Sequence, residues 1–109
     1  MHNALDYVAD KGDEITSPID GKVVRVAPPG TPGLSGLVIE GPKYSAKIFY
    51  ITPDESLVGR FVKVGDKIGV TQEIRAAYGA PNMTNHIHLE IYRLNVKIEP
   101  TSIFQEKSK

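Results

Sequence analysis

Two histidines one residue apart, His86 and His88, are the residues of this sequence best suited to carry chemistry. They lie in the stretch 86–94, where apolar side chains alternate with polar ones. On a β-strand the side chains of such a pair project from one face, and their Cα atoms lie about 6.6 Å apart. This spacing allows one ring to bind a metal ion while the other faces a metal-bound water. Two surface histidines on a half-exposed strand would show the same pattern.

A second pair, His2 and Asp6, stands at the start of the chain. In a fully extended backbone these residues would lie about 13 Å apart, too far to share a zinc ion with bonds of about 2 Å. We therefore expect a helical turn or a bent loop here, and Asn3 favours one because asparagine tolerates left-handed backbone geometry. Taken alone, the pair better fits a frayed chain terminus.

The two pairs carry more weight together than apart. Catalytic zinc sites usually have three protein ligands and one open position for water. His2, Asp6 and one of His86 and His88 supply that number, and one site then accounts for nearly every histidine in the chain. The sequence lacks His-Glu-x-x-His, which excludes the helical zincin arrangement.

Short β-strands are the elements that must position these side chains. Apolar and β-branched runs bounded by Gly and Pro predict strands at 21–27, 37–40, 44–51, 61–64, 67–70 and 86–94. The strands at 61–64 and 67–70 are expected to be joined by a tight turn. A short helix is plausible at 73–78, and a closing turn or helix at 99–104. The sum is one all-β domain of mostly antiparallel strands, a sandwich or a partly open barrel.

Composition narrows the function classes. The 109 residues fit one domain, and 13 basic residues balance 13 acidic ones without a basic run, so neither nucleic acid nor an anionic membrane is expected as a partner. The absence of Cys excludes disulfides and Cys-based metal sites. No apolar run reaches the length of a membrane span, and no signal-peptide pattern opens the chain. We expect a cytoplasmic or phage-type product, a mature form, or part of a larger protein.

Several motifs resemble those of the lysostaphin-type (LytM-like) zinc metallopeptidases, which cut peptide cross-bridges in bacterial cell walls. The similar segments extend over almost the whole chain and comprise 2–6, 17–24, 49–50, 62–69, 86–90 and 99–100. The resemblance implies one peptidase-like domain at 1–105, followed by a charged tail at 106–109. It also implies a peptide or peptidoglycan ligand and an extracytoplasmic or phage-associated location.

The resemblance also implies a role for individual residues. His2, Asp6 and His88 would bind Zn²⁺, and His86 would act as general base on the zinc-bound water, whose pKa zinc lowers toward about 7. Glu90 would either orient a ligand histidine or face solvent as an ordinary strand carboxylate.

One departure from the family pattern bears on activity. Active members carry Tyr-x-His where this chain has Tyr50-Ile51-Thr52. A threonine hydroxyl at position 52 is a weaker donor than the missing imidazole, and losing one oxyanion donor costs on the order of 10²- to 10³-fold in rate. The segment 47–53 also resembles the catalytically incomplete leukocyte cell-derived chemotaxin branch. We therefore expect hydrolysis to be weak or lost.

Two other readings stay open at this stage. The first is an active cell-wall endopeptidase in which Tyr50 or water replaces the missing histidine. The second is a structural or carrier-like β-domain, because 17–24 and 62–69 also resemble biotinyl and lipoyl carrier domains. Those domains display a lysine at a hairpin tip, and neither Lys43 nor Lys47 has that setting.

Overall fold

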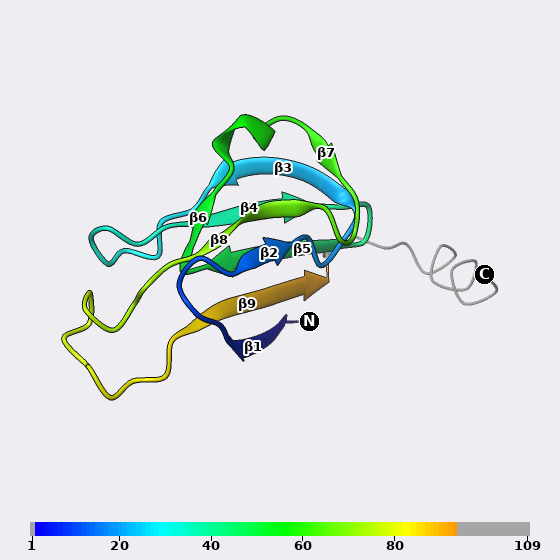
Figure 1. Cartoon of the computed structure of the whole chain (residues 1–109). Coiled ribbons are helices and arrows are strands. Elements are labelled where there is room, and N and C mark those ends of the chain that lie inside the picture. The colour runs from blue at the N-terminus through cyan, green and yellow to red at the C-terminus, as the bar shows by residue number, and fades with distance from the viewer. Residues whose placement is uncertain (1, 94–109) are drawn as a thin grey trace.

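The computed structural model describes residues 2–93, with only the backbone described for residues 2 and 3. Nine β-strands and one short 3-10 helix make up this part of the chain (Figure 1). The strands are β1 (His2–Val8), β2 (Glu14–Thr16), β3 (Gly21–Val26), β4 (Gly36–Glu40), β5 (Tyr44–Phe49), β6 (Ile51–Pro53), β7 (Phe61–Val62), β8 (Lys67–Thr71) and β9 (His86–Arg93). The 3-10 helix η1 is Glu55–Leu57. The expected all-β fold is confirmed.

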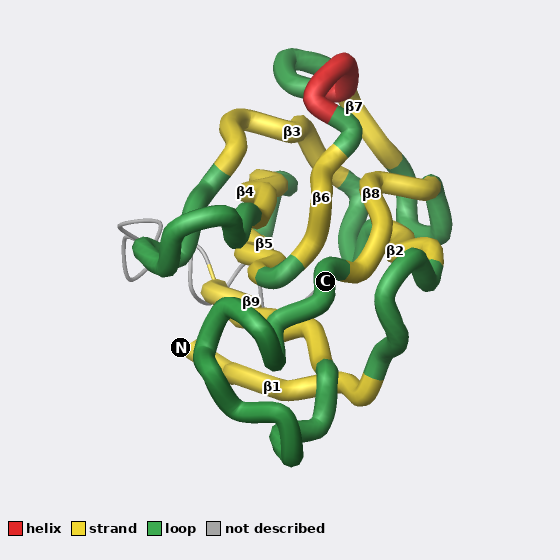
Figure 2. Tube along the Cα trace, turned by 60° about the vertical axis from the view of Figure 1, so that its left-hand side comes forward, coloured by secondary structure: helices red, strands yellow, loops and turns green. Residues whose placement is uncertain are grey.

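The strands form two antiparallel sheets. The larger has the order β1-β9-β5-β4-β3-β7, and the smaller has the order β2-β8-β6. The view along the strands shows the small sheet lying across one side of the large one (Figure 2). Aliphatic side chains from both sheets fill the space between them, among them Leu37, Ile39, Ile48, Ile51 and Ile68, each at most 1% exposed.

Hydrogen bonds join the motifs at 17–24 and 62–69. Ser17 is buried, and its backbone amide donates to the carbonyl of Asp66 at 2.8 Å. Asp20 accepts a hydrogen bond from the amide of Val64 at 2.7 Å. Gly69 lets β8 approach β6, because a Cβ there would lie 2.5 Å from the Thr52 carbonyl oxygen. These contacts therefore join the connection between β2 and β3 to the connection between β7 and β8, and they allow the strands of the small sheet to pack closely.

Two local expectations were wrong, and a third was right in part. The predicted strand 44–51 is broken at Tyr50, where the backbone turns left-handed with φ of 72° and the chain passes from one sheet to the other. The strands β7 and β8 are joined by the expected tight turn, closed by a bond from the Asp66 amide to the Lys63 carbonyl at 2.9 Å, but they do not pair with each other, because β7 pairs with β3 whereas β8 pairs with β2 and β6. Residues 73–78 form no helix but a turn, closed by a bond from the Tyr78 amide to the Ile74 carbonyl.

The N-terminal segment differs most from what the sequence predicts. The bend expected between His2 and Asp6 is absent, because β1 runs extended from His2 to Val8 and pairs residue by residue with β9. The edge of β9 offers backbone hydrogen-bonding groups to the whole segment, and pairing satisfies them on both strands. The closing turn expected at 99–104 and the tail at 106–109 lie outside the described residues.

Candidate functional site

The outer face of the large sheet gathers the polar side chains of β9. Ile87 and Leu89 point into the core and are 8% and 9% exposed, whereas His86, His88 and Glu90 on the opposite face are partly exposed. This is the alternation that the sequence predicts for β9, and it is confirmed. It places both imidazoles on one surface, where a ligand can reach them.

Asp6 lies directly opposite His88 in the β1–β9 ladder. Side chains at such paired positions are close neighbours on one face of a sheet. The Asp6 carboxylate oxygen Oδ1 lies 2.7 Å from Nδ1 of His88 and 3.8 Å from Nε2 of His86. One carboxylate oxygen therefore faces both imidazoles, although Asp6 and the histidines are 80 residues or more apart in the sequence.

His88 is held from both sides. Its Nε2 lies 3.0 Å from Oε2 of Glu90, whose other oxygen accepts a hydrogen bond from the Tyr92 hydroxyl at 2.6 Å. The ring also stacks on Phe49, with 6.0 Å between ring centroids. Burial lowers the pKa of His88, but the hydrogen bonds to Asp6 and Glu90 outweigh it and raise the pKa above its ordinary value.

His86 has a different set of neighbours. Its Nδ1 lies 2.9 Å from the carbonyl oxygen of Thr84, which can only accept, so Nδ1 carries the proton. In the neutral ring Nε2 is then the unprotonated nitrogen, and it is the nitrogen that faces Asp6. The edge of the Tyr50 ring meets the imidazole, with 5.5 Å between centroids. His86 therefore presents a lone pair toward the carboxylate and His88.

Thr52 does not join this cluster. It is an exposed residue of β6, paired with Val70 in the small sheet. Among the described residues, Asp6, Phe49, Tyr50 and Glu90 have side chains that interact with the two imidazoles. Tyr50 therefore adjoins an imidazole, whereas Thr52 lies in the other sheet.

Two loops border the site at one end of the sheets, 27–35 between β3 and β4 and 72–85 between β8 and β9 (Figure 1). Asn85, 4% exposed, fixes the longer loop: its side chain accepts from the Ile74 amide at 2.8 Å and donates to the carbonyls of Ala9 and Gln72, each at 2.9 Å. The Gln72 side chain accepts from the Ser35 amide at 2.9 Å and donates to the Gly33 carbonyl at 3.1 Å. The sequence analysis missed both residues, because nothing in one sequence shows that a loop amide side chain bonds to distant backbone groups.

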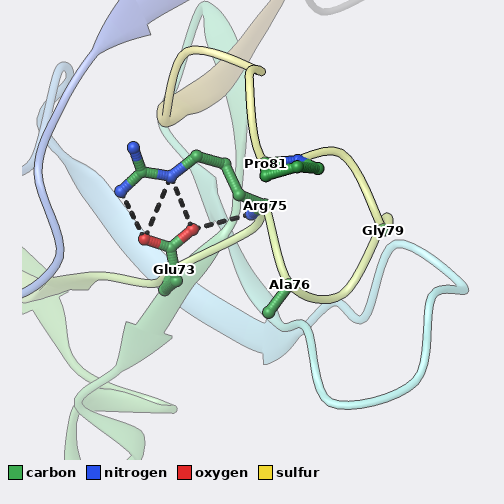
Figure 3. Close-up of a pocket in the computed structure, with 5 residues that line it drawn as sticks. All are labelled: Glu73, Arg75, Ala76, Gly79 and Pro81. Carbon is green, nitrogen blue, oxygen red and sulfur yellow. Dashed lines mark hydrogen bonds and ion pairs between the residues drawn. The ribbon is translucent and has the colours of Figure 1, made fainter.

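The long loop also carries a hollow of about 450 Å³ on its outer side. Glu73, Arg75, Ala76, Gly79 and Pro81 line it, and Glu73 and Arg75 form an ion pair with a shortest distance of 2.6 Å (Figure 3). The hydrogen bonds from Arg75 lower the pKa of Glu73 to about 2. Neither histidine lines this hollow, so we assign it to loop structure.

The described residues bring together two side chains of types that zinc accepts as ligands. Asp6 and His88 are acceptable zinc ligands in contact, and the ligands of a tetrahedral zinc lie roughly 3.3 Å apart, so a small separation of the pair would admit the ion. Within residues 2–93 no group of three or more His, Asp or Glu side chains has the arrangement of a metal site. The side chain of His2 is outside this description, and its backbone pairs with Tyr92, four residues along an extended strand from Asp6.

An all-β fold with imidazoles and a carboxylate on one sheet face is typical of a class of β-sheet peptidases. A model of peptidase family M23 matches residues 1–100, and the chain belongs to that family. A comparison with curated protein sequences gives no match. No helix within residues 2–93 is long and apolar enough to cross a membrane.

Solved structures show the same fold. LytU is 26% identical with a TM-score of 0.66, over 84% of this chain and 61% of that one. The catalytic domain of the antimicrobial peptidase lysostaphin from Staphylococcus simulans is 18% identical with a TM-score of 0.60, over 84% and 66%. Csd3 of Helicobacter pylori is 23% identical with a TM-score of 0.61, over 94% and 31%. The chain thus spans between about a third and two thirds of these structures.

Proposed function

We propose that this chain is a zinc-binding peptidase-fold domain that binds peptides on the face formed by β1, β9 and β5, and that its hydrolytic activity is weak or lost. The ligand is a peptide of peptidoglycan, either a stem peptide or a cross-bridge, met outside the cytoplasm or in a phage context. The observation that carries the proposal is the Asp6 carboxylate set against Nδ1 of His88 with Nε2 of His86 beside it.

The proposed zinc ligands are His2, Asp6 and His88. Asp6 and His88 already adjoin, and Glu90 on the far side of His88 would hold the ring in the orientation that turns Nδ1 toward the ion. Recruiting His2 requires the first residues of β1 to leave β9 and bend, since an extended strand separates positions 2 and 6 by about 13 Å. When bound, zinc supplies a polarised water that loses its proton near neutral pH.

His86 is the proposed general base. The Thr84 carbonyl fixes the proton on Nδ1, which leaves Nε2 to accept a proton on the side of the site that faces Asp6. The weak hydrolysis follows from Thr52, which places no imidazole at the position where active relatives hold the scissile carbonyl. A second candidate, an active endopeptidase, is favoured by the Tyr50 ring against His86.

The metal assignment is tested by zinc content and affinity of protein purified without chelator. We expect His88→Ala and Asp6→Ala to lower zinc affinity at least tenfold. His86→Ala is the matched control on the same strand, and Asp10→Ala is the control for an exposed aspartate near the same end of the chain. Full occupancy in the His88→Ala variant would remove His88 from the ligand set.

The peptide assignment is tested with labelled pentaglycine and a soluble stem peptide. Binding without turnover, weakened by substitutions on the β9 face, is the expected result. Cleavage that stops both with a zinc chelator and with His86→Ala would establish the endopeptidase and overturn the proposed loss of hydrolysis. Absence of binding to either peptide would overturn the proposed function.

A further inference from the structure

Three hydroxyl groups form a chain that ends at the candidate site. The Thr31 hydroxyl, from the loop 27–35, donates to the Tyr78 hydroxyl at 3.1 Å. The Tyr78 hydroxyl, from the loop 72–85, lies 2.9 Å from that of Tyr50, whose ring meets His86 edge-on. The rings of the two tyrosines are themselves edge-to-face, with 6.0 Å between centroids. Residues from three separate segments thus converge beside the imidazole.

The backbone at Tyr50 is held in a conformation that a bulky residue rarely adopts. Its φ of 72° lies in the left-handed region, which is strained for a residue with a bulky side chain. Two hydrogen bonds fix it, from the Tyr50 amide to the Ser35 carbonyl at 2.8 Å and from the Gln72 amide to the Tyr50 carbonyl at 2.9 Å. Glycine would adopt this geometry without strain, so the presence of tyrosine points to a use for the side chain.

The chain of hydroxyls can offer one proton to a ligand. Thr31 donates to Tyr78, and either tyrosine hydroxyl can donate to the other. In the arrangement in which Tyr78 donates to the oxygen of Tyr50, the Tyr50 proton is available to an acceptor outside the chain of three. Burial, the bond with Tyr78 and the nearby Asp6 charge raise the pKa of Tyr50 to about 12, so the hydroxyl keeps its proton at neutral pH. Each donor in such a chain polarises the next.

We propose that the Tyr50 hydroxyl donates a hydrogen bond to a backbone carbonyl of the peptide bound beside His86, with Tyr78 and Thr31 as positioning residues behind it. This inference rests on the proposed function and deepens it, because it names a group that binds the backbone of the peptide. A neutral phenol recognises a carbonyl whatever the peptide side chains are, which suits glycine-rich or small-residue segments. Tyr50 thereby provides a donor on the side of His86 where Thr52 provides none.

The test is a double-mutant cycle between the protein and the peptide carbonyl. Pentaglycine and a stem peptide are each prepared with one amide oxygen at a time replaced by sulfur, a weaker acceptor, and binding is measured to wild type and Tyr50→Phe. We expect Tyr50→Phe to weaken binding of the normal peptide about threefold to tenfold, the range of one neutral hydrogen bond. At one peptide position the sulfur substitution should weaken binding to wild type and leave binding to Tyr50→Phe unchanged.

The neighbouring hydroxyls supply a graded control. Tyr78→Phe and Thr31→Val leave the Tyr50 donor in place, so each should weaken binding less than Tyr50→Phe does. Tyr44→Phe should leave binding unchanged, because Tyr44 is an exposed tyrosine at the far end of β5 whose side chain lies on the same face as Ala46 and Ile48, opposite to the face that carries the histidines. Melting temperatures of all variants separate loss of a donor from loss of folding.

The outcomes separate the inference from the function it rests on. If wild type binds the peptides but no sulfur position couples to Tyr50→Phe, the donor role is overturned while peptide binding stands. Equal losses of melting temperature in Tyr50→Phe and Tyr78→Phe without any loss of binding would mean that the three hydroxyls only stabilise the loops. This result would also overturn the inference. If wild type binds neither peptide, both proposals fail together.

Discussion

The candidate site has two halves that are held in different ways. The half formed by Asp6, His86 and His88 lies on paired strands, where backbone register alone sets which side chains meet. The half formed by Tyr50, Tyr78 and Thr31 lies on loops and a strand break, where the amide side chains of Asn85 and Gln72 set the geometry. In the proposed function, the paired strands β1 and β9 supply the carboxylate and the imidazoles, whereas the loops position the bound peptide.

The halves also differ in how strongly they are anchored. In the strand half, His86 and His88 share β9 with the core residues Ile87 and Leu89, so the core anchors the two histidines, whereas Asp6 lies on the edge strand β1. The loop half depends on a few hydrogen bonds from Asn85 and Gln72. Single substitutions can therefore loosen the loops while leaving the strands in place.

The largest expected effect comes from Asn85→Ala. The change removes a buried side chain that satisfies the Ile74 amide and the carbonyls of Ala9 and Gln72, and each buried group left unsatisfied costs about 1–3 kcal/mol. We expect a loss of about 3 kcal/mol in the free energy of unfolding, equivalent to a fall in Tm of roughly 10–20 °C. Thermal unfolding by circular dichroism measures it.

Asn82→Ala is the matched control, an exposed asparagine in the same loop, and should change stability by less than about 0.5 kcal/mol. Similar melting of the two variants would show that Asn85 does not anchor the loop. The loop half of the site would then not depend on the hydrogen bonds of Asn85.

The strand half was largely predictable from the sequence, and the loop half was not. Period-two alternation places His86 and His88 on the face opposite Ile87, because strand geometry is the same wherever a strand forms. The conformation of β1 was not predictable, since a terminal segment takes the shape of the edge it meets, and β9 offered one. The strand break at Tyr50 was not predictable from the sequence, because tyrosine favours strands and rarely adopts a left-handed backbone conformation.

The bonding partners of loop amide side chains are the other feature that one sequence does not reveal. Asn85 and Gln72 have the composition of ordinary turn residues, and their partners are carbonyls and amides up to 76 residues away. Tyr78 fell within a stretch expected to be helical, and its contact with Tyr50 depends on the turn that forms instead. Long-range polar contacts of this kind require the fold before they can be inferred.

A smaller and more local effect is expected for Gln72→Ala. The change removes the two side-chain hydrogen bonds to the loop 27–35, at Ser35 and Gly33, for a loss of about 1–2 kcal/mol. Hydrogen exchange followed by mass spectrometry should show faster exchange in peptides that cover 30–36. Peptides that cover β9 should keep wild-type protection.

Faster exchange throughout β9 in that variant would mean that the loop and strand halves form one cooperative unit, contrary to the comparison above. Gln105→Ala, which changes the same residue type outside the residues described here, is a control for the substitution itself.

The smallest effect is expected at the exposed ion pair on the long loop. Because Arg75 lowers the pKa of Glu73 to about 2, the pair contributes stability that is present above the ordinary pKa of Glu and is lost as pH falls through about 2. Glu73→Gln should therefore lower stability equally at pH 5 and pH 7 and less at pH 2, which narrows the stability difference between pH 5 and pH 2 by a small amount because an exposed pair is screened by solvent. Urea unfolding at both pH values checks this, with Glu55→Gln, an exposed carboxylate in η1, as control. A pH dependence identical to wild type would leave the hydrogen bonds of Asn85 and Gln72, rather than charge, as the forces that hold the loop half of the site.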